Sequence, residues 1–304
     1  MPRVSVVIPA YNAAALVGLT LESVLNATCK DLEVIVVNDG SQDGTAAVAS
    51  GYGPRVRVIS QKNAGMSASR NRGIQDSDSE FIALVDSDDI WHPQKIMWQI
   101  AAFEAHPDHA YCFTEFTSWN GGVSSEFLSQ PRSGAIEPNL TGWIYHKLLL
   151  TNWALPSSMI FRRQAWNTTG PFLCDDQQTD DWEYFVRASR SFQFLKLAEP
   201  FVLYRQHPGS LSRKVPVKNT TELMRESLIA RYGTSSPDGT KVNAKELERR
   251  RYVGWSNFAD AHSSRGSLGT GLDTFAKLLL TGPRRGESVQ RLAKSLVRRA
   301  FPKR

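Results

Sequence analysis

The sequence contains few cysteines, only Cys29, Cys112 and Cys174 in 304 residues. Three is an odd number, and their positions lack the short spacings of metal-binding cysteine pairs. This excludes a disulfide-stapled secreted domain and a cysteine-based zinc site. We therefore expect reduced thiols in a cytoplasmic protein, and we assign the cysteines no function.

Long apolar runs are missing as well. No run approaches the roughly 18 apolar residues that cross a bilayer. The apolar run at 4–8 is cut by Pro9 and is too short for a signal peptide. We therefore expect a cytoplasmic chain that is soluble or attached peripherally to the inner face of the membrane.

Acidic residues are scarce in the last third of the chain. Residues 1–212 contain 16 Lys/Arg and 22 Asp/Glu, a net charge of −6, whereas residues 213–304 contain 20 and 8, a net charge of +12. Grouped carboxylates suit metal binding and acid/base chemistry, and a basic tail suits a phosphate-rich surface, a lipid or a nucleic acid.

The first half of the chain alternates short β-branched runs with helical periods. Strands are predicted at 4–8, 33–37, 56–59 and 81–85, each followed by a polar turn and a helix, with Asn12 as the expected cap of the first helix. This alternation predicts an α/β fold with a doubly wound, mostly parallel sheet. Ligands bind at the carboxyl ends of such strands, where polar residues of this chain also gather.

The last part of the chain is predicted to be helical. Strand signals at 111–116, 158–161 and 201–204 stop after about residue 212, and 222–231, 245–260, 268–280 and 288–301 have helical periods. We expect a catalytic domain at 1–212 and a basic helical region at 213–304.

Asp86-Ser87-Asp88-Asp89 places three carboxylates at the end of an apolar strand. Their mutual repulsion is costly unless a cation binds between them, and a hard divalent ion completed by a diphosphate would satisfy that need. The alternative is a solvated acidic turn that caps the next helix.

Three further motifs accompany this acidic turn in a characteristic order. They are Ser5-Val-Val-Ile-Pro-Ala-Tyr-Asn12, Val36-Val-Asn-Asp-Gly-Ser-Gln-Asp-Gly-Thr45 and Asn63-Ala-Gly-Met-Ser-Ala-Ser-Arg-Asn71. Over roughly residues 1–210 the chain resembles family 2 glycosyltransferases. The resemblance implies the GT-A fold and inverting transfer of a sugar from a nucleoside diphosphate, typically with uracil as the base.

The resemblance also implies which residues contact the donor. Pro9, Tyr11 and Asp39 would surround the nucleobase, although an Asp before Gly40 is also a common turn residue. Lys62 and Arg70 would face the diphosphate, with a helix-surface arginine as the alternative for Arg70. In the acidic motif, Asp86 and Ser87 would contact the donor near the ribose, and Asp88 would coordinate Mn²⁺ or Mg²⁺.

A second acidic motif, Thr179-Asp180-Asp181-Trp182-Glu183, follows Gly170-Pro-Phe172 at the distance that the family shows. The resemblance implies that Asp181 is the catalytic base. Asp180, Trp182 and Glu183 would position the acceptor, with Asp180 standing where the family usually has Glu. An acidic helix N-terminus favoured by the macrodipole is the alternative.

Tyr204-Arg-Gln-His-Pro-Gly-Ser-Leu-Ser212 resembles a late segment of the family near the donor phosphates. His207 would be a further metal ligand or a phosphate contact, and a structural histidine is the alternative.

The tail has an apolar stripe at helical spacing, flanked by lysines and arginines. Its members are Val289, Leu292, Ala293, Leu296, Val297, Ala300 and Phe301. This pattern fits a helix on an anionic membrane, where a lipid-linked acceptor would be found. A helix packed on the catalytic domain is the alternative. Nucleic acid is not expected, because the tail lacks interleaved aromatic residues.

The motifs and the resemblance together predict a metal-dependent glycosyltransferase. The resemblance alone implies a glycan or glycolipid acceptor in cell-surface polysaccharide synthesis. A sugar nucleotidyltransferase would be expected to have a Gly-rich basic loop after its first strand, where this chain has Pro9-Ala-Tyr-Asn12. A donor-binding protein without activity is the other alternative, and it would be supported by loss of Asp88 or Asp181.

Overall fold

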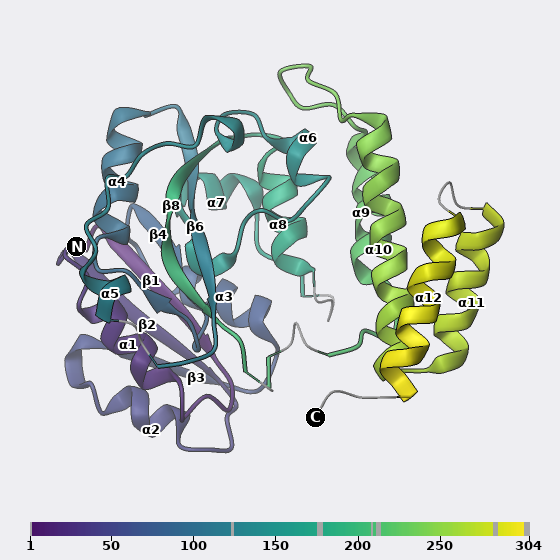
Figure 1. The fold of residues 1–304 in the computed structure, drawn as a ribbon. Coiled ribbons are helices and arrows are strands. Elements are labelled where there is room, and N and C mark those ends of the chain that lie inside the picture. Colours follow the sequence, from purple (N-terminus) through teal and green to yellow (C-terminus); the bar gives the residue numbers. More distant parts are fainter. Residues whose placement is uncertain are drawn as a thin grey trace. The chain divides into compact units, whose positions relative to one another are not determined.

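The computed structural model describes residues 2–122, 125–174, 179–207, 209–210, 214–281 and 285–300 (Figure 1). The chain divides into two units. Unit 1 comprises Met1–Leu148, Asn152–His207 and Ser236–Gly239, and unit 2 comprises Leu149–Thr151, Pro208–Ser235 and Thr240–Arg304. Each unit is described separately below.

The β-branched runs of unit 1 form the parallel part of an eight-stranded sheet. The strands are β1 (Val4–Ala10), β2 (Leu32–Asp39), β3 (Arg57–Gln61) and β4 (Phe81–Leu84). β1 pairs in parallel with β2 and β4, and β2 pairs in parallel with β3. β1 is buried along its whole length, as expected for a strand covered on both faces.

The second half of the sheet is mixed. β7 (Ile160–Arg162) is antiparallel to β4 and β6 (His109–Trp119), β6 is parallel to β8 (Gln193–Arg205), and β5 (Ile90–Trp91) is antiparallel to β8. The strand order is β3-β2-β1-β4-β7-β6-β8-β5. The predicted α/β fold with a mostly parallel sheet is therefore confirmed.

Helices cover both faces of this sheet. Alternate residues of a strand point to opposite faces, and Val4, Val6 and Ile8 share a core with α1 (Val17–Leu25) and α4 (Lys95–Ala105). On the other face lies α3 (Met66–Gln75), which packs against β1 and β2.

Gly73 explains how closely α3 approaches the sheet. A Cβ atom at this position would lie 2.5 Å from Cγ1 of Val7 and 3.2 Å from Cγ2 of Val37. Only a glycine fits there, although glycine in a helix costs about 1 kcal/mol relative to alanine. The close approach brings the start of α3, with Arg70, next to the carboxyl ends of the strands.

The remaining helices of unit 1 are short. They are α2 (Thr45–Ser50), η1 (Gly53–Arg55), α5 (Ser125–Ser129), η2 (Pro138–Leu140), α6 (Tyr145–Leu148), η3 (Pro156–Ser158), α7 (Arg163–Thr169) and α8 (Asp180–Ala188).

Unit 2 is helical, as predicted. It contains α9 (Thr220–Tyr232), α10 (Ala244–Arg265), α11 (Leu268–Thr281) and α12 (Arg285–Ala300). Figure 1 shows α10, α11 and α12 lying alongside one another. Tyr252, Ala259, Phe275 and Leu278 form their shared core.

Two details of the structure differ from the sequence predictions. Asn12 does not cap the first helix: α1 begins at Val17 without a side-chain cap, and Asn12 has a φ of 49° and bonds to the next loop instead. β5 and α4 were not predicted. None of the helices in the described part of the chain is long and apolar enough to cross a membrane.

Candidate active site

The loops that follow β1 and β2 are bonded to each other. The Asn12 amide donates to Ser41 Oγ at 3.0 Å, and Asn12 Oδ1 accepts from the Gln42 amide at 2.8 Å. Asp43 accepts from the amides of Ala14 and Thr45, both at 3.0 Å. These contacts fix the backbone beside the exposed Tyr11 ring and connect Asp43 to the loops that follow β1 and β2.

Asp39 holds the loop that follows β3. Its buried carboxylate accepts hydrogen bonds from Gln61 Nε2 at 2.8 Å, from the Ala64 amide at 2.9 Å and from the Gly65 amide at 2.8 Å. The loops after β1, β2 and β3 therefore form one connected rim at the carboxyl ends of the strands. Lys62 lies exposed on this rim.

The turn Asp86-Ser87-Asp88-Asp89 is locked from two sides. Ser157 Oγ accepts from the Asp86 amide at 2.9 Å and donates to the buried Asp89 carboxylate at 2.5 Å. At the end of β8, the Arg205 amide donates to Asp89 at 2.9 Å and its Nε donates to the Asp88 carbonyl at 2.7 Å. Asp89 thus joins three separate elements.

Asp88 and His207 meet on the partly exposed side of this turn. Nε2 of His207 lies 3.0 Å from Oδ2 of Asp88, and both side chains are about one-quarter exposed. Burial, followed by the nearby Asp86 charge, raises the pKa of the Asp88 carboxyl, although His207 lowers it. Burial also raises the pKa of Asp89 well above its ordinary value. This cluster therefore concentrates negative charge in a partly desolvated place.

Arg70 is the buried cation beside that turn. It is 3% exposed, and its Nη2 donates to Asp86 Oδ1 at 2.7 Å. Burial works against its charge, but the carboxylates of Asp86, Asp181 and Asp180 outweigh burial and raise the pKa of the guanidinium. Arg70 therefore stays charged and links residues of both acidic motifs.

Asp181 enters the same site from the first turn of α8. Burial raises the pKa of its carboxyl, whereas the Arg70 charge and a 2.7 Å hydrogen bond from the Trp182 amide lower it, and the net shift is upward. Its neighbour Asp180 accepts from Ser67 Oγ of α3 at 3.1 Å. Helices α3 and α8 thus meet at the carboxylates that sequence reasoning singled out.

Trp182 and Glu183 face away from solvent. The Trp182 indole donates to the Leu148 carbonyl at 2.7 Å. Glu183 accepts two hydrogen bonds from Arg187, at 2.8 and 2.9 Å, and Arg187 also donates to the carbonyls of Thr169 and Pro171. These contacts hold the start of α8 in place, and acceptor contact by Trp182 or Glu183 stays a prediction.

The structure therefore brings the predicted residues into three groups. Pro9, Tyr11, Asp39 and Lys62 lie on the rim; Arg70, Asp86, Asp180 and Asp181 form a charged cluster; Ser87, Asp88 and His207 lie at the acidic turn. Electrostatic coupling between Asp86 and Asp88 joins the last two groups.

Sequence reasoning missed several residues that support the site. Ser157 had no local signal, because a serine after a proline is common in loops. Arg205 was part of a noted segment without a role. Asn71 ends one of the quoted motifs but was given no role. Its side-chain amide pairs with the backbone of Phe172 through both nitrogen and oxygen, at 2.8 and 2.9 Å.

The acidic turn has the donor atoms that a hard cation requires. Among the residues that the structure describes, no three His, Cys, Asp or Glu side chains converge on one point. Asp88 and His207 do so as a pair, and carboxylate oxygen is the ligand that Mg²⁺ and Mn²⁺ prefer. Burial, followed by neighbouring carboxylates, raises the pKa of Asp88 and of Asp89, and a bound cation would favour the charged form of both. The residues fit a divalent ion that takes its other ligands from a diphosphate.

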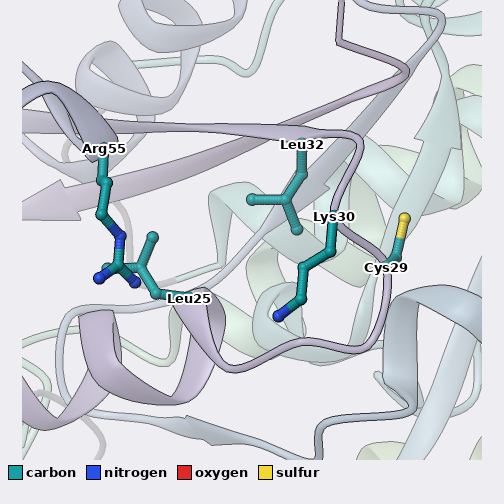
Figure 2. A pocket seen from close by; sticks show the side chains of 5 residues that line it. All are labelled: Leu25, Cys29, Lys30, Leu32 and Arg55. Atoms are coloured by element: carbon teal, nitrogen blue, oxygen red, sulfur yellow. The ribbon is translucent and has the colours of Figure 1, made fainter.

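A separate pocket, drawn in Figure 2, lies at the opposite ends of strands β2 and β3. It is lined by Leu25, Cys29, Lys30, Leu32 and Arg55. Leu32 begins β2 and Arg55 precedes β3, so this pocket is at the amino ends of the strands and takes no part in the cluster described above.

Residues 5–170 match the family model described as glycosyl transferase family 2. The glycosyltransferase EpsH of Bacillus subtilis is 29% identical over 279 residues, which are 86% of this chain and 76% of that protein. Chondroitin synthase of Escherichia coli is 28% identical over 236 residues, 75% of this chain, but the match spans only 33% of that longer protein.

Two solved structures share the fold. TarS of S. aureus in complex with UDP-GlcNAc has a TM-score of 0.66 at 16% identity, and the match covers 97% of this chain and 89% of that one. The mannosyltransferase PcManGT of Pyrobaculum calidifontis, in complex with GDP-Man and Mn²⁺, has a TM-score of 0.57 at 19% identity, covering 100% and 88%. At these identities the likeness concerns the GT-A fold alone.

Proposed function

Because the chain belongs to glycosyl transferase family 2, we propose that it transfers a sugar from a UDP-sugar to an acceptor hydroxyl with inversion at the anomeric carbon. One observation carries the proposal. Arg70 lies among Asp86, from the end of a strand, and Asp180 and Asp181, from the start of a helix far along the chain. A leaving-group site at Arg70 and a base at Asp181 would thereby be adjacent.

The donor would lie along the rim and the acidic turn. Tyr11, Pro9 and Asp39 would surround the base, Asp86 and Ser87 the ribose, and Lys62 and Arg70 the diphosphate. Support comes from the two structural neighbours, whose complexes hold UDP-GlcNAc and GDP-Man. Arg70 is held by Asp86 in advance, so its charge needs little rearrangement to face a leaving phosphate.

Asp88, with His207, would hold Mn²⁺ or Mg²⁺. When bound, the ion would neutralise charge on the departing diphosphate. The Mn²⁺ in the complex of PcManGT supports this assignment. Asp89 and Arg205 would keep the Asp88 backbone in place.

Asp181 would act as the general base. It would remove the proton from the acceptor hydroxyl as that oxygen forms a bond to the anomeric carbon. The bond from this carbon to the diphosphate would break on the opposite face, which gives inversion. Burial raises the pKa of Asp181, and a stronger base accepts the hydroxyl proton more readily.

The acceptor would be a glycan or a glycolipid in cell-surface polysaccharide synthesis. Relatives named chondroitin synthase and hyaluronan synthase support this substrate class. We also propose peripheral attachment to the inner face of the membrane, where a lipid-linked acceptor would be presented.

A donor screen tests the proposal. The protein is incubated with a set of nucleotide sugars and Mn²⁺, and release of nucleoside diphosphate is measured with and without EDTA. We expect Mn²⁺-dependent release from one UDP-sugar, abolished in Asp88→Ala and retained in Asp108→Ala, which removes an exposed carboxylate away from the site. In a parallel assay, release of pyrophosphate from a nucleoside triphosphate and a sugar 1-phosphate would instead indicate a nucleotidyltransferase, and tight binding without turnover of any donor would indicate a non-catalytic protein.

A further inference from the structure

Within unit 2, helix α12 packs against α10 largely through polar side chains. Ser288 and Ser295 are fully buried. The hydroxyl of Ser288 lies 2.9 Å from that of Tyr252, and Ser295 donates to the carboxylate of Asp260. Both partners belong to α10.

Arg299 continues this polar seam. It donates to the backbone carbonyls of His262, Ser263 and Gly266, at the end of α10. Leu292 adds an apolar contact with the core of the helices. The face of α12 that packs is therefore the one with serines and an arginine.

The apolar stripe of α12 consequently points outward. Val289 is 55% exposed, Leu296 is 38% exposed and Val297 is 59% exposed. Ala293 and Ala300 of the same stripe are exposed as well. A surface helix ordinarily turns such a stripe toward the core. The predicted apolar stripe is therefore present on α12, but most of its side chains face solvent. Phe301 lies outside the described residues.

Helix α11 packs through apolar side chains but leaves others exposed. It buries Phe275 and Leu278 and leaves Leu272 (39%), Ala276 and Leu280 (75%) exposed, four residues apart along one side. Helices α11 and α12 contact each other, and we call their exposed apolar residues together the α11–α12 apolar surface. Its members are Leu272, Ala276, Leu280, Val289, Ala293, Leu296, Val297 and Ala300.

Cationic side chains adjoin this surface. Lys294 and Arg298 are exposed on α12, within about one turn of Val297. Residues 213–304 as a whole carry 20 Lys/Arg against 8 Asp/Glu, a net charge of +12. Apolar side chains beside cations match a bilayer that has anionic headgroups above an acyl interior. A second copy of the same positively charged region would meet it with repulsion instead.

We infer that the α11–α12 apolar surface is the part of the chain that docks on an anionic lipid bilayer. Val289, Leu296 and Val297 enter the interface between headgroups and acyl chains, and Lys294 and Arg298 contact the headgroup phosphates. This inference identifies the residues that would make the membrane attachment proposed above. It rests on the proposed function only for the lipid-linked acceptor, which gives the attachment its purpose.

Sedimentation with vesicles tests the inference on the full chain. Vesicles of phosphatidylcholine mixed with phosphatidylglycerol are compared with pure phosphatidylcholine, at low and high salt. We expect binding to the mixed vesicles only, weakened by salt. Val289→Ser/Val297→Ser should lower the apparent partition coefficient at least about tenfold. Lys294→Glu/Arg298→Glu should lower it at least about twentyfold, since each cation near the surface contributes about fivefold.

Control variants test whether a loss of vesicle binding comes from the α11–α12 apolar surface or from any loss of an exposed valine or of positive charge in unit 2. Val217→Ser removes a valine that is 88% exposed elsewhere in unit 2, and Lys241→Glu/Lys245→Glu makes the same change of charge at exposed positions off the surface. Both should bind nearly as well as the unchanged protein. All the variants alter exposed positions, so thermal unfolding and Mn²⁺-dependent donor turnover should stay unchanged.

Three results would overturn the inference. The first is equal binding to both kinds of vesicle, and the second is an equal loss in the control variants. The third is concentration-dependent dimerisation that Val289→Ser/Val297→Ser abolishes, because a second copy would then cover the surface. Vesicle binding is read without any donor, so failure of the proposed transfer reaction would leave this result intact.

Discussion

Asp181 follows Asp86 by 95 residues and Arg70 by 111 residues in the sequence, yet its carboxyl interacts electrostatically with both. A base must lie where the acceptor hydroxyl arrives, and it should contribute little to holding the nucleotide. Residue-level tests can therefore separate donor binding from transfer.

Asp181→Asn keeps the shape of the side chain and removes its basicity. General-base catalysis contributes about 10² to 10⁴ in rate, so we expect transfer to fall at least about a hundredfold. Donor affinity, measured by calorimetry, should stay within a few-fold. Asp180→Asn is the matched control and should cost less. Near-normal transfer by Asp181→Asn beside a large loss in Asp180→Asn would assign the base to Asp180.

The pH dependence of the transfer rate is a second test of Asp181 as the general base. Because burial raises the pKa of Asp181, the carboxylate is lost at a higher pH than an ordinary aspartate. The rate should fall on the acid side through this raised pKa, and the fall should disappear in Asp181→Asn.

Lys95 is a buried cation outside the site. Its Nζ lies 2.8 Å from Gln99 Oε1 and 4.0 Å from the centre of the Trp91 ring, and burial lowers its pKa from 10.5 to about 7. The unfolded chain binds the proton more tightly than the folded one between pH 7 and 10.5. Stability should therefore be lowest below pH 7 and rise with pH, by at most about 1.4 kcal/mol per unit.

Lys95→Met should remove this slope, because methionine fills the same space without a charge. Urea unfolding at pH 7 and pH 9 measures it, and the variant should be the more stable protein at pH 7. Lys30→Met, at an exposed position, should keep the slope. The same slope in Lys95→Met as in the unchanged protein would contradict the prediction.

At the scale of elements, α3 owes its place to the close contact of Gly73 with β1. Gly73→Ala would put a Cβ atom 2.5 Å from Val7 Cγ1, so the helix must move away from the sheet. We expect a loss of about 1–3 kcal/mol in unfolding free energy. Gly18→Ala in α1 has its nearest atom at 3.5 Å and should be neutral or stabilising by up to about 1 kcal/mol. If Gly73→Ala and Gly18→Ala changed the thermal unfolding of the protein equally, the contact between Gly73 and β1 would be looser than the structure has it.

The acidic turn depends on η3 in a similar way. Ser157→Ala removes the hydroxyl that bridges the Asp86 amide and the Asp89 carboxylate. We expect the apparent affinity for Mn²⁺, measured by titration in the presence of the donor nucleotide, to fall at least about tenfold, since one hydrogen bond to a charged group is worth about 1.5 kcal/mol or more. Ser129→Ala, on the exposed part of α5, should leave it unchanged. Unchanged affinity in Ser157→Ala would mean that Arg205 alone fixes the turn.

Some helices and strands could be predicted from the sequence and others could not. The strands at 4–8, 33–37 and 81–85 were identifiable because buried parallel strands are continuous β-branched runs. β5 has only two residues, Ile90 and Trp91, too few to show any period. α4 hides its period because Lys95 and Gln99 lie on its buried face. The four motifs identified the charged cluster, but Ser157 and Arg205 act through contacts that no local pattern records.

Helix α12 shows most clearly what the sequence pattern could not predict, namely which face of a helix packs. Its apolar stripe was identified from the sequence, and a stripe is ordinarily the buried face. Here Ser288, Ser295 and Arg299 supply the packing. Which face of an amphipathic helix packs is decided by its partners, and the partners on α10 are themselves polar.

At the scale of the whole molecule, each unit has its own core. Val4, Val36 and Phe81 belong to one core, and Tyr252 and Phe275 belong to the other. All residues proposed for the donor site lie in unit 1. A donor should therefore stabilise unit 1 directly.

Calorimetry checks this expectation. We expect two thermal transitions, and UDP with Mn²⁺ at about a hundred times its dissociation constant should raise one of them, by a stabilisation of about 2.7 kcal/mol. The other should not move. Asp88→Ala should abolish the shift. A single transition that moves as a whole would show that the two units unfold together.

The division of the chain between these units is not a single cut. Leu149–Thr151 belongs to unit 2 although unit 1 flanks it on both sides, and the Leu149 carbonyl accepts a hydrogen bond from Arg225 of α9. During synthesis on a ribosome, this short segment emerges long before the helix that binds it. A nascent chain that ends near residue 212 would therefore present Leu149 without its partner, and the later helices must return to it before either unit is complete.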